Sequence, residues 1–410
     1  MEGERRPGED PAVIQRILAA RALRSFADGF IAVVLPAYLL ALGLGQLEVG
    51  VISTSTLLGS ALATLVIGRW GNRFSIRRLL LGAALLMAAT GLGFAGFSSF
   101  WPLLVVAFVG TLNPSSGDAS IFMPLDHTVL ANAADRPGAF ARYSFIGSMA
   151  GALGALAAAL PEALGARIAM VDALRLMFVL YAAVGIGAWA LYLGLPDVLA
   201  ADGAPPAPLG PSRGIVWRLA ALFSVDSFAG GLILNSLLAL WLFERHGMSL
   251  AAAAAFFFWT GLLSACSQLA AAPLARRIGM INTMVFTHIP SSLFLIGAAL
   301  ATRLDVALAC LLARSLLSQM DVPARGAFVM SVVTPAERPA AASFTSVPRS
   351  LAASISPSIT GAMFAAGAMA APLVACGVLK IAYDLALFAA FRRVEARTRD
   401  AYEDRKAAAS

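Results

Sequence analysis

Twelve ionisable side chains lie inside long apolar runs of this 410-residue chain, where each needs a partner or a function. The acids are Asp28, Asp118, Asp126, Asp226, Asp321 and Asp384, and the bases are Arg24, Arg142, Arg314, Arg325, Arg349 and Lys380. An ionisable group at the centre of an apolar layer costs about 2.5 to 3.5 kcal/mol on insertion scales. The balance of acids and bases favours mutual pairing, and the carboxylates are also groups that could load and release a proton.

One apolar run, residues 304–333, carries a polar stripe. Its members are separated by four, three and four positions: Arg314, Ser318, Asp321 and Arg325. On a helix this spacing stacks the four side chains on one face. Pro323 follows Asp321 near mid-run, and it removes a backbone donor and frees carbonyls to face a cavity.

The run 101–131 repeats this arrangement in the first half of the chain. Asn113-Pro114-Ser115-Ser116-Gly117-Asp118 occupies its middle, and Asp118 aligns within one residue of Asp321 when the halves are superposed. Thr111 and Ser115 share its face. Broken, polar helices at matching places in two halves are the best sequence pointer to a transporter site.

Other ionisable groups allow a simpler explanation. Arg24, Arg142 and Asp226 lie near the expected inner ends of their helices, where a long side chain can reach the surface. Arg24 and Asp28 are four residues apart and can pair on one helical face. Lys380 and Asp384 have the same spacing and are expected to form a structural pair.

Arg349 follows Pro348 near the middle of its run and is the most isolated base. Its guanidinium could neutralise Asp321 or Asp118, with a slight preference for the counter-ion role, or it could hold an anionic group of a substrate. His127 and His288 could relay protons, although a packing role is the more common one for such histidines.

The elements that must position these groups are membrane helices. The chain is 59% hydrophobic and 13% charged, with a mean hydropathy of +0.80, whereas a soluble domain carries roughly 25% charge. The apolar runs are continuous rather than alternating, which predicts helices rather than a barrel. Twelve spans are expected: 20–42, 48–68, 78–98, 101–131, 138–160, 171–195, 216–243, 250–273, 281–301, 304–333, 340–366 and 371–391. No cleavable signal peptide is indicated, so the first span is expected to be retained.

The distribution of positive charge predicts the orientation. Counted with the flanking helix ends, 20 Lys and Arg lie on the side of the termini, and 4 lie on the opposite side: Arg167, Arg175, Arg245 and Arg303. The positive-inside rule therefore puts both termini in the cytoplasm. This topology accounts for the net charge of +7, and nothing in the basic residues indicates nucleic-acid binding.

The chain repeats itself at an offset of about 202 to 204 residues. Ser25-Phe26-Ala27-Asp28-Gly29 aligns with Ser227-Phe228-Ala229-Gly230-Gly231, and Asp135-Arg136-Pro137 aligns with Glu337-Arg338-Pro339. A Pro- and Gly-rich stretch separates the halves. The expected organisation is a tail at 1–19, a six-helix bundle at 20–195, a cytoplasmic linker at 196–215, a second six-helix bundle at 216–391 and a tail at 392–410.

Twelve spans in a six-plus-six repeat, with a polar linker and a basic turn after the second and eighth spans, resemble the major facilitator superfamily. The family's loop motif G-x-x-x-D-R-x-G-R-R is partly met by Gly68, Arg73 and Arg77, with Asn72 at the position of the acid. The resemblance implies that this loop acts as a latch between the two halves. The resemblance implies an all-α fold of two pseudo-symmetric bundles, in which the first, fourth, seventh and tenth helices line a central cavity. The antiporter signature of the fifth helix is absent.

The resulting expectation is a secondary transporter that moves a small solute by alternating access, with proton coupling favoured and a monomer in the cytoplasmic (inner) membrane. Asp28, Asp118 and Asp321 are the candidate proton carriers, and Ser115, Asp226, Arg314, Arg325 and Arg349 are further candidates for the cavity. Sodium coupling, uncoupled transport and a transport-inactive membrane receptor or assembly partner stay open. No enzyme, cofactor or metal is expected: H-E-x-x-H, G-x-S-G and the phosphate loop are absent, and Cys266, Cys310 and Cys376 have no metal-ligand spacing.

Overall fold

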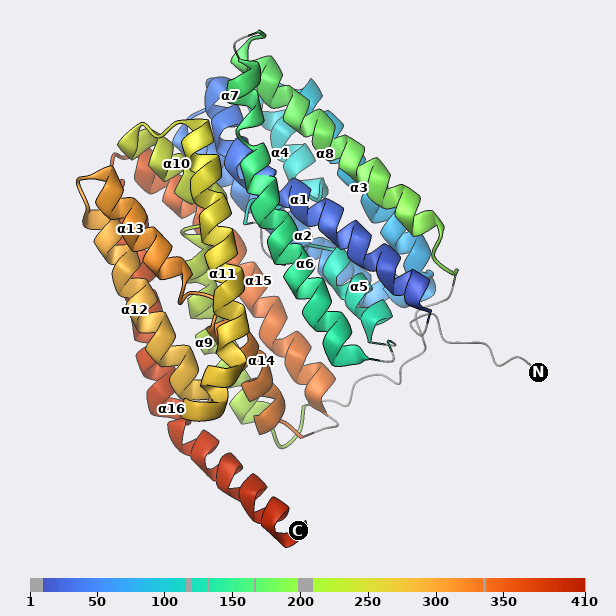
Figure 1. Ribbon diagram of the computed structural model, residues 1–410, viewed down its shortest axis with the longest axis vertical. Coiled ribbons are helices and arrows are strands. Elements are labelled where there is room, and N and C mark those ends of the chain that lie inside the picture. Colours follow the sequence, from blue (N-terminus) through green and yellow to red (C-terminus); the bar gives the residue numbers. More distant parts are fainter. Residues whose placement is uncertain are drawn as a thin grey trace. The chain divides into compact units, whose positions relative to one another are not determined.

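The computed structural model describes residues 10–115, 120–131, 133, 135–165, 167–197, 209–334 and 337–409, and throughout these ranges the secondary structure is helical, without strands (Figure 1). The first half contains α1 (Pro11–Ala41), α2 (Gln46–Trp70), α3 (Ile76–Gly96), α4 (Phe100–Val109), α5 (Phe122–Leu130), α6 (Arg136–Ala157), α7 (Leu160–Leu164) and α8 (Met170–Leu193). The second half contains α9 (Arg213–Gly231), α10 (Asn235–His246), α11 (Leu250–Ile278), α12 (Met280–Leu300), α13 (Leu304–Ser315), α14 (Asp321–Val332), α15 (Arg338–Ala365) and α16 (Ala371–Ala409). The prediction of an all-helical membrane fold is confirmed.

The first and last helices are longer than predicted. The carboxylate of Asp10 accepts a hydrogen bond from the backbone N–H of Ala12 at 2.9 Å, and Pro11 opens α1, so the helix starts nine residues before the predicted span. At the other end, α16 continues to Ala409, through the segment 392–410 that was expected to be a tail. Local helix-forming chemistry extends beyond the apolar part in both cases.

Three predicted spans are pairs of shorter helices. The fourth is α4 and α5, the seventh is α9 and α10, and the tenth is α13 and α14. Interruptions of the fourth and tenth were expected from their Pro-containing polar segments. The break in the seventh, at residues 232–234, was not expected, although two glycines, Gly230 and Gly231, end α9 there. Glycine is a poor helix former, and it weakens the helix at this point.

Surface composition agrees with a bilayer environment. Nine helical stretches in the described part of the chain are long and apolar enough to cross a membrane. Large apolar side chains remain exposed along them, among them Leu269 at 66% and Leu300 at 64%. A soluble protein would not leave so many large apolar side chains in water.

The helices cluster into two compact units that do not follow the order of the chain. The first contains Met1–Asp202, Ile233–Leu262 and Ser354–Met369, and the second contains Gly203–Leu232, Leu263–Ala353 and Ala370–Ser410. In the first unit, α1 packs against α6 and α8, and α3 packs against α8. Small residues allow this close approach: a methyl group at Gly29 would lie 2.1 Å from the carbonyl oxygen of Gly151.

The second unit is built around α12. This helix packs against α13, α14 and α16, and α9 also packs against α16. A contiguous apolar core joins Phe223 of α9, Met284 of α12, Phe328 of α14 and Tyr383 of α16. The charged network described below, which consists of Asp226, His288, Asp321, Arg325, Lys380 and Asp384, lies on these same four helices, so the core fixes its position.

Candidate functional site

Asp226 lies at the centre of a buried charge network in the second unit. Its Oδ1 accepts a hydrogen bond from Lys380 Nζ at 2.6 Å, and its Oδ2 accepts one from Arg325 Nη1 at 3.0 Å. The Asp226 side chain is only 7% exposed. The expectation that the Asp226 side chain reaches the surface is therefore wrong, because it is buried where α9 packs against α14 and α16.

Asp321 is the second acid of the network. It opens α14 and pairs with Arg325 one turn later, at 2.9 Å. Pro323 is tolerated because it lies in the first helical turn, where its missing N–H would have no intrahelical partner. The predicted four-residue stripe is thereby divided: Asp321 and Arg325 lie on α14, while Arg314 ends α13.

His288 of α12 connects the network to Asp384. Its Nδ1 is 3.1 Å from Asp384 Oδ1, and its Nε2 is 3.3 Å from Lys380 Nζ and 3.9 Å from Asp226 Oδ1. The predicted structural pair of Lys380 and Asp384 is therefore wrong. Both residues share a face of α16, but the imidazole lies between them and the lysine extends to α9.

Arg349 of α15 lies at the edge of this network. Its Nε donates a hydrogen bond to Ser227 Oγ at 3.1 Å, and the structure gives it no ion pair with an acid of the described residues. The slight preference for Arg349 as the counter-ion of Asp321 is wrong, since Arg325 takes that place one turn away on the same helix.

Arg314 is separate from the network. Its side chain lies near Cys376 of α16, and its backbone carbonyl accepts a hydrogen bond from Ser291 Oγ of α12 at 3.4 Å. It has no ion pair with an acid in the described ranges of the chain.

The first unit holds a smaller buried cluster. Arg24 of α1 forms an ion pair with Asp126 of α5, and Tyr143 donates a hydrogen bond to the same carboxylate at 2.8 Å. The expected pairing of Arg24 with Asp28 is thus replaced by a pairing between helices. Asp28 is partly buried on α1, and His127 packs its ring against Phe140 and Tyr143.

The break between α4 and α5 follows from local chemistry. The side-chain oxygen of Asn113 accepts hydrogen bonds from the backbone N–H of Ser115 at 3.1 Å and from its hydroxyl at 2.7 Å. Such an Asx turn competes with the helical hydrogen bonds, and Pro114 disfavours a helical conformation at Asn113. The other candidate of this segment, Asp118, lies outside the described residues.

The predicted latch loop joins α2 to α3. Gly68 lies near the end of α2, Asn72 and Arg73 form a short 3-10 turn, and Arg77 lies in the first turn of α3. The neighbouring Arg78 forms an exposed ion pair with Asp197 at 3.2 Å. Hydrogen bonding from Ser75, reinforced by Arg78, lowers the pKa of the Asp197 carboxyl. Sequence reasoning did not identify this pairing, because 119 residues separate Arg78 from Asp197.

Segments of the two sequence halves meet inside the first unit. On α2, Gly50 packs against Gly361 of α15, and Ser358 Oγ donates a hydrogen bond to Thr54 Oγ1 at 2.7 Å. Gln46 Nε2 also donates to Glu244 Oε2 of α10 at 2.7 Å. These contacts occur near the start of α2 and near the ends of α10 and α15. We call this set of contacts the α2–α15 seam.

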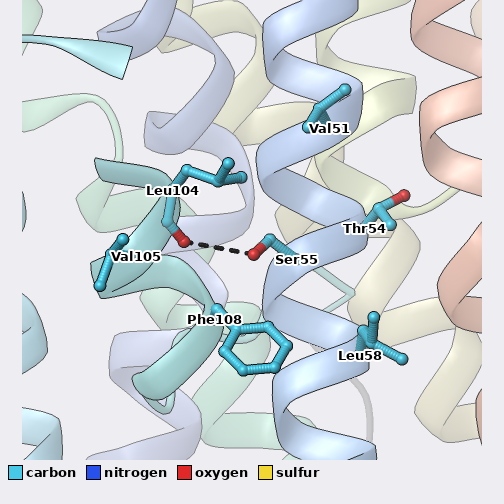
Figure 2. Close-up of a pocket in the computed structure, with 7 residues that line it drawn as sticks. All are labelled: Val51, Thr54, Ser55, Leu58, Leu104, Val105 and Phe108. Atoms are coloured by element: carbon cyan, nitrogen blue, oxygen red, sulfur yellow. Dashed lines mark hydrogen bonds between the residues drawn. The ribbon is translucent and has the colours of Figure 1, made fainter. Parts of the chain in front are cut away.

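A groove of about 370 Å³ lies between α2 and α4 (Figure 2). Figure 2 shows Ser55 Oγ donating to the carbonyl oxygen of Leu104, at 3.2 Å, with Leu58 and Phe108 beside it. The lining residues are apolar or carry a hydroxyl: Val51, Thr54, Ser55, Leu58, Leu104, Val105 and Phe108. Val105 and Phe108 are exposed, so this groove opens on the surface of the first unit and differs in character from the buried charge network.

A helical chain with an apolar surface, interrupted helices and buried charges at their breaks has the features of a membrane transporter. The chain matches the Major Facilitator Superfamily over residues 17–318, and it belongs to that family. It is accordingly a transporter and not an enzyme.

Similar proteins agree with this assignment. The uncharacterized membrane protein YJR124C of Saccharomyces cerevisiae is 23% identical over 425 residues, covering 94% of this chain and 95% of that one. The nucleoside transporter NupG, as a mutant, superposes with a TM-score of 0.73 at 15% identity, over 92% of this chain and 99% of that chain. The xylose transporter XylE from E. coli, in an inward open conformation, superposes with a TM-score of 0.71 at 16% identity, over 92% of this chain and 96% of that chain. At these identities the structural likeness concerns the fold.

Proposed function

We propose that this protein is a proton-coupled secondary transporter that moves a small solute by alternating access. The observation that carries the proposal is the buried network of Asp226, Asp321, Arg325 and Lys380 on three helices. Buried ion pairs of this kind are costly to desolvate, and replacing them with apolar residues is often neutral or stabilising. Their presence in a membrane domain therefore points to a role in moving charge.

The network holds two carboxylates and two cations that share one another as partners. Asp226 is shared by two cations, while Arg325 is shared by two acids, so one added proton can redistribute these bonds without breaking all of them. Asp321 lies at the start of α14, immediately after the interruption of the tenth span. We assign Asp321 and, by the internal repeat, Asp118 as the pair of acids that load and release protons, with Asp28 as a third candidate.

Arg349 is the candidate contact for the solute. A guanidinium in a membrane domain that has no carboxylate partner among the described residues carries a positive charge that an anionic or strongly polar group of a solute can compensate. Ser115 and Arg314 are further candidates for the solute path. The names of the similar structures include a nucleoside and a sugar, so they do not narrow the choice of solute.

In this proposal the α2–α15 seam is a closed gate. The protein acts as a monomer in the inner membrane, and the positive-inside rule puts both of its termini in the cytoplasm. The seam is then the gate on the outer side. The orientation is tested with a cysteine at Ala207 in the linker, in a background in which Cys266, Cys310 and Cys376 are alanine. An impermeant thiol reagent should reach this cysteine from the cytoplasmic side, and labelling from outside would contradict the orientation.

Transport is tested with a panel of labelled solutes and purified protein in liposomes, with and without an imposed pH gradient. Accumulation of one solute should depend on the gradient. Asp321→Asn keeps the shape of the side chain and removes its charge, so gradient-driven accumulation should fall while exchange at equal concentrations continues. Asp305→Asn removes an exposed acid at the start of α13 and is the matched control. Accumulation that is the same with and without the pH gradient would refute proton coupling.

A further inference from the structure

The contacts of His288 determine where its proton lies. Lys380 Nζ is 3.3 Å from Nε2, and it also bonds to Asp226 at 2.6 Å. An ammonium group has only donors, so a lysine that bonds to an imidazole nitrogen needs a lone pair there. Nε2 is therefore the unprotonated nitrogen, and Nδ1 carries the hydrogen that it donates to Asp384 at 3.1 Å.

The groups in contact with His288 carry a net negative charge. Its direct partners are Asp384 and Lys380 from α16 and Asp226 from α9, and their formal charges add up to −1. The pair of Asp321 and Arg325 from α14 adds no net charge. The remaining groups facing this region are Tyr383, whose ring centroid is 6.3 Å from that of His288, and two guanidinium groups. These are Arg349, which bonds to Ser227, and Arg314, which lies near Cys376, so the negative charge is confined to the direct contacts of the imidazole.

We propose that Nε2 of His288 is a proton-binding site that links the solvent proton to the Asp226 network, a role that rests on the proposed function. In this step a proton from solvent binds the Nε2 lone pair, and the hydrogen bond from Lys380 to Nε2 breaks. The new N–H faces Asp226 Oδ1, which is 3.9 Å away in the unprotonated arrangement. The imidazolium then lies between two carboxylates, Asp384 and Asp226.

The consequence is a change in the partners of Lys380. The lysine and the imidazolium now compete for the same oxygen of Asp226, because Oδ2 is already occupied by Arg325. Repulsion between two neighbouring cations favours movement of Lys380 or a shift of Asp226 toward His288. Since Asp226 belongs to α9, Lys380 to α16 and His288 to α12, one proton on His288 alters the bonds that hold three helices together.

The location of this site is unexpected. By family resemblance α12 and α16 correspond to the ninth and twelfth spans, which surround the cavity-lining helices. Proton binding on α12 would act on the cavity-lining α9 through Lys380 and Asp226. His288 is thus assigned as a positioning residue for the network, in contact with the proton but not with the solute.

The test is nitrogen NMR of the full-length protein labelled with ¹⁵N-histidine, because the chain has three histidines and their signals can be separated. His127→Gln and His246→Gln assign the His288 signals by elimination, even if a variant at position 288 does not fold. At alkaline pH, His288 should show a protonated Nδ1 and an unprotonated Nε2, and on acidification Nε2 should gain its proton. An Nε2–H tautomer at alkaline pH, or an Nε2 that never gains a proton down to the pH of unfolding, would overturn the proposal.

A variant separates this site from ordinary histidine titration. Lys380→Met removes the donor to Nε2 and frees Asp226 as an acceptor, so the ¹⁵N signals of His288 should differ from those of the wild type. Arg303→Met, which removes an exposed cation, is the control and should leave the His288 signals unchanged. Identical His288 signals in Lys380→Met and wild type would also refute the proposal.

Failure of the proposed function has a different signature. If His288 titrates as described but no solute accumulates in response to a pH gradient, proton-coupled transport is refuted and the proton site stands. If transport follows the gradient but Nε2 never exchanges its proton, the coupling site lies elsewhere in the network.

Discussion

Lys380 Nζ lies 2.6 Å from Asp226 Oδ1 on α9, although an acid, Asp384, lies one turn further along its own helix. The lysine thus joins two helices instead of closing a pair on one. Asp226 in turn bonds to Arg325 of α14, and Asp384 bonds to His288 of α12. A single carboxylate therefore connects helices that are far apart in the sequence, and loss of any member affects packing as well as charge.

The link between Lys380 and Asp226 predicts strong energetic coupling. Removing one partner of a buried ion pair costs about 3 to 5 kcal/mol, because the other charge is left uncompensated. Lys380→Ala and Asp226→Ala should each lower the melting temperature, and the double variant should cost clearly less than the sum. The exposed pair of Arg303 and Asp305, also 2.6 Å apart, is the control and should show little coupling. Additive effects at Lys380 and Asp226 would contradict the geometry.

Asp321 should couple with Arg325 and not with Arg349. The structure pairs Asp321 with Arg325 at 2.9 Å, whereas Arg349 bonds to Ser227. In thermal unfolding, Asp321→Ala with Arg325→Ala should show an interaction energy of about 1 to 3 kcal/mol, and Asp321→Ala with Arg349→Ala should be additive within about 0.5 kcal/mol. Coupling between Asp321 and Arg349, with additive effects for Asp321 and Arg325, would instead identify Arg349 as the counter-ion.

The α2–α15 seam should not tolerate a side chain at Gly50. A methyl group there would lie 2.5 Å from the carbonyl oxygen of Pro357 and 2.9 Å from Gly361 Cα, so backbone atoms must move. Gly50→Ala should destabilise the protein by about 1 to 3 kcal/mol, as overpacking does. Gly82→Ala is the control: no atom lies within 4 Å of the added methyl, and alanine favours a helix, so stability should hold or rise. Equal melting temperatures for the two variants would argue against a tight seam.

Glu337 predicts a dependence of stability on pH. Hydrogen bonds from Ser212, from Thr334 and from the backbone N–H of Gly210 lower the pKa of its carboxyl from 4.5 to about 2. Because the folded-state pKa is depressed, the stabilisation is fully present above about pH 4.5 and is lost as the pH falls toward 2. Between pH 7 and 3, the melting temperature should therefore fall more steeply for the wild type than for Glu337→Gln. Parallel curves would show that these hydrogen bonds do not favour the ionised carboxyl.

Several features of the candidate site could be predicted from the sequence because they follow from local chemistry. Apolar runs longer than a bilayer is thick predict membrane helices, since every backbone group must be satisfied within the segment. Asn113 and Pro114 predict the break between α4 and α5, and Pro323 predicts the interruption near Asp321. The internal repeat and the basic turn after the second span indicated the family.

The partners of the charged residues were decided by the tertiary structure. Spacing of four residues allows a pair on one helix, and Asp321 with Arg325 forms one, but Lys380 with Asp384 and Arg24 with Asp28 do not. The physical reason is reach: in a packed helical unit, a long side chain can meet a carboxylate of a neighbouring helix as easily as one on its own. Only the packing of α9, α12, α14 and α16 around a common core brings Asp226, His288 and Lys380 within hydrogen-bonding distance, and no local pattern in the sequence encodes which helices become neighbours.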